Sequence, residues 1–441
     1  MSITSSETKK ILIKIISFFF LLTPFALLTG PFFTDLLLII ISLLFLYLSF
    51  SNKIFYYFNN NYFKLIITFC LLISLRSIYI QKFELSFITS FFYFRFLIFS
   101  LAVWYILENN KDVKRIFFYI LLLVFLFLFI DSFYQFIFRK NIFGYDIYAI
   151  DRVSSVFGKE LILGGVILRF SLISFPLLIY FYKNSIFFEF FFLLKTIILF
   201  LIVLIAGERS AIFLMSMQII LYIFFIKKLR VKFFLFFFLI TLFLSIFIYF
   251  NKNVKERILN NTFYLFTEKE ESKDFISNNT YTNEFIKKVQ TKDINFFSRG
   301  HQSHFATAIK MFLEEPIFGV GVKMFRHLCA DKKFYTEPMG CNTHPHNTYI
   351  QLLAETGIIG FLLFFIIFLY LIKYLFLESI RIIFKKNSII EKEYKTSLII
   401  AVFINLWPLV TTGNFFNNYL SFYYYLPVGF LLITLVKKTK V

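Results

Sequence analysis

The chain has 441 residues, of which 59% are hydrophobic, 22% are aromatic and only 16% are charged. A soluble domain of this length can bury a large core, but it cannot hide uncharged runs such as Phe233 to Phe250, so the composition excludes an ordinary soluble protein. The formal net charge is +20, yet Lys and Arg recur at nearly every second loop between apolar runs, which is the pattern of membrane topology and predicts no nucleic-acid partner.

Twelve apolar segments are each close to the roughly 20 residues that a helix needs to cross a hydrocarbon layer about 30 Å thick. In chain order these predicted spans are 11–29, 33–50, 63–80, 86–107, 114–138, 160–182, 187–206, 210–226, 232–250, 347–374, 396–412 and 420–436. The first segment has no small-residue cleavage site before Pro31, so we expect a retained helix and not a signal peptide. The predicted fold class is all-α, a polytopic membrane bundle of about twelve transmembrane helices.

Positive charge in the loops predicts the orientation of the chain. Lys53, Lys111 and Lys183 lie in loops of one side, and the positive-inside rule places that side in the cytoplasm together with both termini. The alternate loops then face outward, including one long polar loop. We therefore expect a single integrated membrane domain with spans 1–9 in residues 1–250, an outer loop in residues 251–346 and spans 10–12 in residues 347–441.

The outer loop holds all five histidines of the chain, between His301 and His346. Its segment 297–328 alternates apolar and polar residues at helical spacing, and the helix is expected to end before Pro316. The predicted apolar face consists of Phe305, Ala308, Ile309 and Phe312. An amphipathic helix that lies on the outer membrane surface or caps the bundle would have this pattern.

The chain has three cysteines, and two of them lie in the outer loop. Cys70 lies inside a predicted span, where we expect it to be buried as a small hydrophobic residue. For Cys329 and Cys341 the sequence leaves open whether they form a disulfide. A bond between them would hold the segment that leads directly into His344 and His346.

Arginines on the outer side are candidates for binding an anionic substrate. Arg152, Arg209 and Arg299 all fall there, although the chain uses Lys freely elsewhere. A planar guanidinium matches phosphate oxygens better than an ammonium group does. The alternative for Arg209 is an ion pair with Glu208 or a position at the membrane interface. Snorkelling or helix pairing is the expectation for three further arginines near or within apolar spans, Arg76, Arg95 and Arg169.

Three motifs follow one another in this part of the chain: Ser-Arg-Gly at 298–300, Glu-Pro-Ile-Phe-Gly-Val-Gly at 315–321, and His-Asn-Thr-Tyr-Ile-Gln-Leu-Leu-Ala-Glu-Thr-Gly at 346–357. Together with Arg209 in a short outer turn and Arg152 before Phe157 and Gly158, they resemble the O-antigen ligase and polymerase superfamily over roughly residues 150–375. The chain departs from the family pattern at His304, where an aromatic is commoner, at Glu160, where Asn often follows the Phe-Gly, and at Ile350, which replaces Leu.

The resemblance implies a membrane glycosyltransferase of the ligase type, which moves a glycan from undecaprenyl diphosphate to lipid A-core on the periplasmic face of the inner membrane. The outer loop would then be periplasmic, and the reaction would need no cofactor and no metal. Arg209, Arg299 and, more weakly, Arg152 would bind the diphosphate. His346 would be the general base, since a helix that begins near Asn347 disfavours added positive charge and keeps the imidazole neutral.

Other roles for these residues stay open. His344 lies two residues before His346 and is an alternative base, and His346 is alternatively only a hydrogen-bonded residue at a helix start. The histidines together are an alternative metal site, but no spacing among them forms a known closed site. A tight turn is the expectation for Gly319 and Gly321. For Glu355, nine residues beyond His346 along the same predicted helix, we expect no direct contact with that imidazole.

The alternatives for function fall in two groups. A polysaccharide polymerase or a protein O-oligosaccharyltransferase would use the same chemistry and differ in the acceptor alone. The alternative of another class is a polysaccharide or lipid transporter or flippase. A transporter should have Gly- or Pro-broken helices in paired repeats with ionisable groups near the membrane midplane, and the sequence indicates neither.

Overall fold

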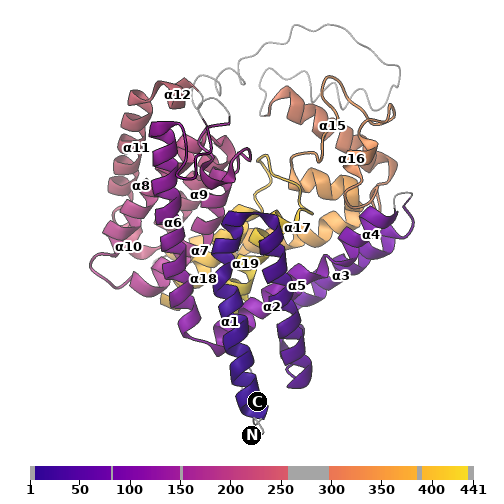
Figure 1. Ribbon diagram of the computed structural model, residues 1–441, viewed down its shortest axis with the longest axis horizontal. Coiled ribbons are helices and arrows are strands. Elements are labelled where there is room, and N and C mark those ends of the chain that lie inside the picture. The colour runs from indigo at the N-terminus through magenta and orange to yellow at the C-terminus, as the bar shows by residue number, and fades with distance from the viewer. Residues whose placement is uncertain (1–4, 81–82, 149–151, 257–296, 385–389, 436–441) are drawn as a thin grey trace.

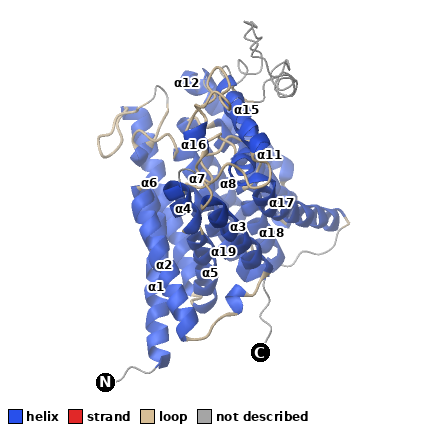
Figure 2. Ribbon diagram, turned by 90° about the vertical axis from the view of Figure 1, so that its right-hand side faces the viewer, coloured by secondary structure: helices blue, strands red, loops and turns tan. Residues whose placement is uncertain are grey.

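Helices are the regular elements of the computed structural model, which describes residues 5–80, 83–148, 152–256, 297–384 and 390–435. Figure 2 shows helices and loops and no strand within these ranges, so the all-α prediction is confirmed for them. The α-helices are α1 (Ser5–Thr29), α2 (Pro31–Ser51), α3 (Asn61–Ser77), α4 (Phe83–Phe91), α5 (Phe94–Asn109), α6 (Asp112–Phe138), α7 (Leu163–Tyr182), α8 (Phe188–Ala206), α9 (Arg209–Phe225), α10 (Lys227–Arg230), α11 (Phe233–Phe250), α12 (Lys252–Lys255), α15 (Arg299–Glu314), α16 (Phe325–Leu328), α17 (Thr348–Ile383), α18 (Ile390–Asn405) and α19 (Asn418–Leu435), with short 3-10 turns η1 (Tyr56–Phe58) and η2 (Ser155–Phe157).

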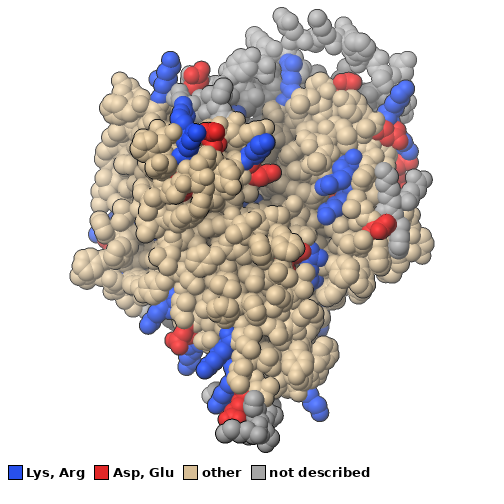
Figure 3. All heavy atoms as spheres, in the orientation of Figure 1, with Lys and Arg blue, Asp and Glu red and all other residues tan. Residues whose placement is uncertain are grey.

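Seven helical segments of the described chain are long and apolar enough to cross a membrane. They are Glu7–Thr29, Pro31–Ser51, Glu84–Asn109, Asp112–Phe138, Leu163–Tyr182, Phe188–Ala206 and Thr348–Ile383, and shorter apolar helices span Arg209–Phe225 and Phe237–Phe250. In Figure 3, Lys, Arg, Asp and Glu gather toward the two ends of the visible face and leave a broad belt between them that is mostly uncharged. The chain is therefore a helical membrane protein, and the number of twelve spans stays a prediction.

Three predicted spans differ from the helices that form. The span 347–374 becomes α17, which continues to Ile383 and is broken at Gly357. The span 86–107 lies within the candidate membrane segment Glu84–Asn109, which a turn at Phe92 and Tyr93 divides into α4 and α5. The span 396–412 is wrong at its end, because α18 stops at Asn405 and a non-helical loop covers residues 406–417. Pro408 explains this stop, since proline lacks an N–H donor and disfavours helical geometry in the residue before it.

The centre of the bundle is formed by α5 and α19, which pack against each other. Twelve consecutive residues of α5, from Phe96 to Leu107, are buried, and Phe99 packs on Phe422 with ring centroids 4.9 Å apart. The helix pair α1 and α2 lies beside α5, while α7 packs against α8 and α18. Figure 1 places α15 and α16 at the end of the bundle opposite both chain termini, and we call it the α15 end.

The helix α17 is broken at Gly357, and the turn 316–321 fills the break. Gly357 has φ 64° and ψ −171°, so the usual helical hydrogen bonds around it are lost. The N–H groups of Val320 and Gly321 donate instead to the carbonyls of Ala354 and Glu355, at 2.9 and 3.0 Å. In return, the N–H groups of residues 358 and 359 donate to the carbonyls of residues 316 and 317, at 2.8 and 3.4 Å. The break leaves these backbone groups satisfied, although the sequence did not predict it.

This exchange requires glycine at the closest point between the two segments. A Cβ on Gly319, whose φ is +70°, would lie 2.5 Å from backbone atoms of α17, and one on Gly357 would lie 2.3 Å from the carbonyl oxygen of Ile317. Arg76 on α3 holds the turn from its other side, because its Nε donates to the Gly319 carbonyl at 2.9 Å and its guanidinium pairs with Glu315 at 3.2 Å. Residues 319–321 form the predicted turn, and this turn supplies hydrogen-bond partners to the backbone of α17.

The substitution Gly319→Ala should destabilise the protein by about 3 kcal/mol, because backbone overlap with α17 adds to the cost of a left-handed alanine. Gly144→Ala is the matched control, since Gly144 also has a positive φ, +86°, but a Cβ added there would have nothing within 4 Å. We expect a loss of only about 1 kcal/mol there. Thermal unfolding of both purified variants, followed by tryptophan fluorescence, measures the difference, and equal losses would contradict the packing argument.

Candidate active site

Four of the five histidines meet at the α15 end of the bundle. His301 and His304 project from α15, while His344 and His346 lie on the segment that leads into α17. The ring of His346 is in the middle, with centroid distances of 5.3 Å to His301, 5.3 Å to His304 and 4.0 Å to His344. The fold thus brings together imidazoles that are about 40 residues apart in sequence.

The position of His346 is fixed by the start of α17, as predicted. The helix begins at Thr348 with Asn347 as its N-cap, whose Oδ1 accepts from the N–H groups of Tyr349 and Ile350 at 3.0 and 3.1 Å. The Nδ2 of Asn347 donates to carbonyls of the 406–417 loop, at 2.7 Å to Pro408 and 3.2 Å to Val410. Asn347 therefore acts as a cap and a brace. His346 itself has a left-handed backbone, with φ 59°, and its carbonyl accepts from Thr412 N–H at 2.8 Å.

The two candidate bases differ in how their ring nitrogens are occupied. His344 Nδ1 lies 2.9 Å from the Thr343 hydroxyl, and its Nε2 lies 3.3 Å from the Thr412 carbonyl oxygen, to which it must donate. Both nitrogens of His344 are thus engaged by the protein. Within the described residues, no hydrogen bond engages the ring of His346, which is half-buried. The geometry favours His346 as the imidazole with a nitrogen left for an external proton.

Burial keeps the whole cluster uncharged near neutral pH. Burial first, and then the neighbouring imidazoles, lower the pKa of His346 to about 3. Burial lowers the pKa of His344 to about 4, against an opposing hydrogen bond to Thr412. For His301 the pKa is lowered by burial and by the charge of Arg209, and for His304 by burial and by His301. Crowded imidazoles disfavour protonation of one another, so each remains neutral.

Arg209 lies beside this cluster, at the first residue of α9. Its neighbour Glu208 caps another helix, because the Glu208 carboxylate accepts from the N–H groups of Gly164 and Gly165 in the first turn of α7, at 2.7 and 3.0 Å. The α7 N-terminus thus engages the carboxylate that was the alternative partner for Arg209. Burial nevertheless raises the pKa of Glu208 above its usual value.

The other two predicted arginines are placed differently. Arg152 is half-buried near Glu208 and Arg209, but its guanidinium donates to the carbonyls of Ala206 and Leu161, at 3.1 and 3.3 Å. Arg299 is exposed at the start of α15, two residues before His301, and its guanidinium has no hydrogen-bond or ion-pair partner in the described ranges. The structure therefore brings Arg209 and Arg152 together and leaves Arg299 on the adjacent turn of α15.

The predicted amphipathic helix forms as α15, which ends at Glu314, before Pro316. Its buried face is turned relative to the prediction: Phe305 and Ala308 are buried, but Ile309 and Phe312 are only half-buried. His304, Thr307 and Met311 are buried instead. This face packs against α17, so the residues that are buried on α15 are determined by contact with another helix and not by contact with lipid. The part of the predicted loop at 257–296 lies outside the described residues.

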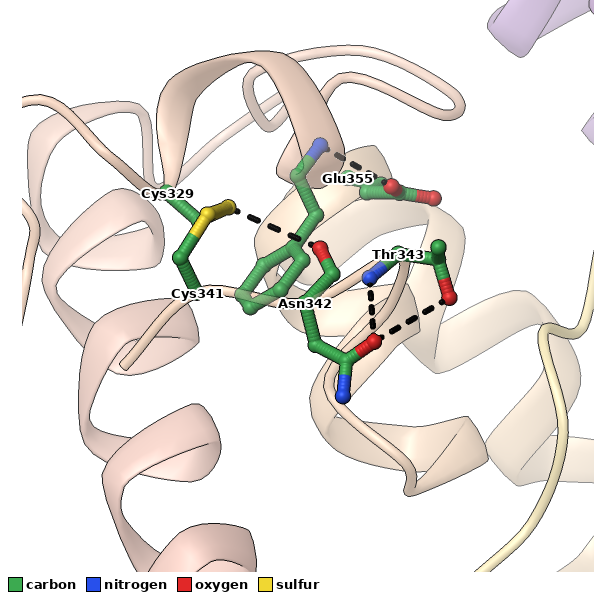
Figure 4. The surroundings of a disulfide bond; sticks show 6 residues. Cys329, Cys341, Asn342, Thr343 and Glu355 are labelled. Atoms are coloured by element: carbon green, nitrogen blue, oxygen red, sulfur yellow. Dashed lines mark hydrogen bonds between the residues drawn. A yellow bond between two sulfur atoms is a disulfide. The ribbon is translucent and has the colours of Figure 1, made fainter. Parts of the chain in front are cut away.

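A disulfide between Cys329 and Cys341 joins α16 to the segment that carries His344, with the two Cα atoms 4.8 Å apart (Figure 4). This pairing resolves what the sequence left open, and Cys70 is buried and free as expected. The Glu355 carboxylate accepts from the N–H of Phe325, at 3.2 Å, and from Gln351 Nε2, at 2.9 Å. Glu355 thus braces α16 and, as predicted, does not orient His346.

The 406–417 loop contributes to the site in a way that the predicted spans missed. Thr412 contacts the backbone of His346, the ring of His344 and, through its hydroxyl, the hydroxyl of Thr348 at 3.0 Å. Asn414 accepts from Gln351 Nε2 at 3.0 Å, and this fixes the loop against α17. The signal was a run of turn-forming residues, Pro408 and then Thr-Thr-Gly-Asn at 411–414, inside an otherwise apolar stretch.

No group of three or more His, Cys, Asp or Glu residues in the described part of the chain is arranged to hold a metal ion. The fold and the site define a polytopic helical membrane protein with an imidazole cluster beside an arginine at one end of its bundle. A family model described as O-antigen ligase matches residues 194–365, which include Arg209, Arg299 and His346. The match confirms the resemblance to the O-antigen ligase-like superfamily and supports a membrane glycosyltransferase of the ligase or polymerase type. No curated protein matches the chain.

The imidazole cluster should make the fold sensitive to acid. The pKa values of His344 and His346, about 4 and about 3, lie below the value near 6.5 expected for unfolded histidine. The unfolded chain therefore binds more protons as pH falls from about 6.5, and the free energy of unfolding decreases in that range. We expect the midpoint of thermal unfolding to fall between pH 7 and pH 4.5, and to fall less in His344→Gln. His327→Gln, at an exposed position on α16, is the control, and identical pH slopes in all three proteins would refute this account.

Proposed function

We propose that the protein is an O-antigen ligase-like glycosyltransferase that moves a glycan from undecaprenyl diphosphate to lipid A-core at the periplasmic face of the inner membrane. The observation that carries this proposal is the half-buried ring of His346, which lies 4.0 Å from His344 and 5.3 Å from His301, the imidazole on which the charge of Arg209 acts. The α15 end would be periplasmic and both termini cytoplasmic, as the loop charges indicate.

In the proposed reaction, the acceptor hydroxyl gives its proton to His346 while its oxygen bonds to the anomeric carbon of the glycan. The bond from that carbon to the diphosphate oxygen breaks, and the lipid diphosphate leaves with the electron pair. General-base catalysis requires a neutral imidazole, which burial provides here. Arg209, with Arg299 and more weakly Arg152, would stabilise the charge that grows on the leaving diphosphate.

The low pKa of His346 also suggests how the base is controlled. A group of pKa about 3 accepts a proton poorly on its own. A bound diphosphate would bring negative charge beside Arg209 and His301, and nearby negative charge raises the pKa of an imidazole. We infer that His346 becomes an effective base only when the donor is bound, which would disfavour proton abstraction in the empty site.

A cavity in the bundle supports a substrate with a lipid chain. Its volume is about 720 Å³, and it lies among α3, α17, α18 and α19 with mostly apolar lining residues. Tyr424 lines this cavity, and its hydroxyl lies 3.2 Å from that of Thr348, which in turn contacts Thr412 beside the histidines. The cavity wall thus contacts the polar network that holds the imidazole cluster at Tyr424, and its lining extends from there to Asn60 before α3 and to Leu435 at the end of α19.

A polymerase or a protein O-oligosaccharyltransferase would use the same residues with another acceptor. A transporter is disfavoured by α17, because the break at Gly357 is closed by backbone hydrogen bonds to the 316–321 turn and does not open a path. The histidines that we assign to the site lie on α15 and on the segment before α17, and so at the α15 end.

Deletion of the gene should distinguish ligase from polymerase in the host. If the protein is a ligase, lipopolysaccharide should lose its long glycan while carrier-linked polymer accumulates, because polymerisation does not need the lipid A-core acceptor. Gel analysis of lipopolysaccharide and of extracted carrier-linked glycan measures both products. Short carrier-linked units without polymer would contradict a ligase and identify a polymerase.

The substitution His346→Ala should reduce transfer by about 10²- to 10⁴-fold, which is the usual contribution of a general base. Arg209→Ala should abolish transfer, because the leaving diphosphate would lose the cation that stabilises its charge. His344→Gln is the control: it keeps a donor to the Thr412 carbonyl and should retain most activity. Rates are compared at equal amounts of membrane-inserted protein. Full activity in His346→Ala with an inactive His344→Gln would move the base to His344.

A further inference from the structure

Two cations on the turn after Gly321 have no ion-pair partner among the described residues. Lys323 is half-buried and has a left-handed backbone with φ 59°, and Arg326 is exposed on α16. Among the described residues, neither side chain has an ion-pair or hydrogen-bond partner. A lysine in the left-handed region is uncommon and persists where the surrounding structure imposes it.

The carboxylates closest to Lys323 are engaged elsewhere. Asp35 accepts from Arg95 at 3.1 and 3.3 Å, and Glu355 accepts from Phe325 N–H and Gln351. Burial first, and then the charge of Arg326, lower the pKa of Lys323. Two adjacent cations without an available carboxylate form a ready site for an anion.

The frame that carries these cations is rigid relative to the histidine cluster. Gly321 N–H donates to the Glu355 carbonyl at 3.0 Å, and the buried Phe325 donates to the Glu355 side chain at 3.2 Å. Three residues beyond Arg326, the disulfide links Cys329 to Cys341, which lies three residues before His344. The charge of Arg326 accordingly acts on His344.

Two histidines of the imidazole cluster each have an arginine nearby. Arg209 acts on His301 and Arg326 acts on His344, and the ring of His346 is in contact with both, with centroid distances of 5.3 and 4.0 Å. In a displacement at the anomeric carbon, the acceptor oxygen approaches opposite the leaving diphosphate. If Arg209 binds the donor, the remainder of the acceptor extends toward the other flank.

We propose that Lys323 and Arg326 bind a phosphate group on the acceptor saccharide, separate from the donor diphosphate at Arg209. The proposal rests on the proposed function, and it specifies an acceptor that is anionic near its reactive hydroxyl. A guanidinium and an ammonium three residues apart supply the forked and point-charge donors that phosphate oxygens accept. A phospholipid headgroup carries the same phosphate chemistry, so the test must separate the two sources.

The test uses the full chain purified in uncharged detergent, with a phosphorylated core-type glycolipid acceptor and the same glycolipid after phosphatase treatment. Binding constants and initial transfer rates are measured for wild type, Lys323→Gln, Arg326→Gln and Arg326→Lys. Each Gln variant should raise Kd and KM for the phosphorylated acceptor about ten-fold, the effect of one charge-assisted hydrogen bond, and leave kcat within about two-fold. Binding of the dephosphorylated acceptor should not change, and Arg326→Lys should keep most of the affinity.

Lys332→Gln is the matched control, because it removes one exposed positive charge from the segment between the two cysteines. It should bind both acceptors as wild type does. Equal weakening of both acceptors, or of neither, by Arg326→Gln would overturn the proposal. The proposal would also be overturned if Arg326→Gln bound phosphatidylglycerol vesicles more weakly than wild type does but bound both acceptors equally well. That result would assign the two cations to a lipid headgroup. If wild type bound the phosphorylated acceptor in a phosphate-dependent way but transferred no glycan, the phosphate site would be supported and the proposed function would be contradicted.

Discussion

The exchange of backbone hydrogen bonds between the 316–321 turn and the broken helix α17 holds the site together. Peptide groups at a helix break inside a bundle cannot be left unpaired, so the break exists only where another segment pairs with it. Here that segment is the continuation of α15, which carries His301 and His304, and the helix it joins begins next to His346. The same contact therefore sets the distance between the two halves of the imidazole cluster.

Local signals in the sequence predicted most of the helices, the end of α15 and the start of α17. Apolar length gave the membrane helices, and Pro316 and Asn347 marked the end of α15 and the start of α17, because proline and capping residues act through their nearest neighbours. The break at Gly357 and the buried 406–417 loop could not be predicted in this way. Each depends on a segment distant in the chain, the 316–321 turn in one case and the α17 N-terminus in the other.

The electrostatics of the site depend on which carboxylates form hydrogen bonds or ion pairs within the fold. Glu208 caps α7, Glu355 braces α16 and Asp35 pairs with Arg95, so three acidic groups near the α15 end are committed to the fold. The sequence shows a carboxylate next to Arg209 but not its direction, which is why an ion pair between them stayed an alternative. Arg209 and Arg152 nevertheless lie on the same side as the histidines, together with the exposed Arg299, and these guanidinium groups favour an anionic substrate.

The 406–417 loop connects the apolar cavity to the histidines through one residue. Thr412 contacts the His346 backbone, the His344 ring and the Thr348 hydroxyl, and Thr348 contacts Tyr424 at the cavity wall. The Thr348 hydroxyl lies 3.0 Å from that of Thr412 and 3.2 Å from that of Tyr424, so a displacement of Tyr424 by a chain in the cavity would break a contact of this network. In the proposed function, this chain of hydroxyls is the route by which a lipid chain in the cavity would act on the segment that carries the imidazoles.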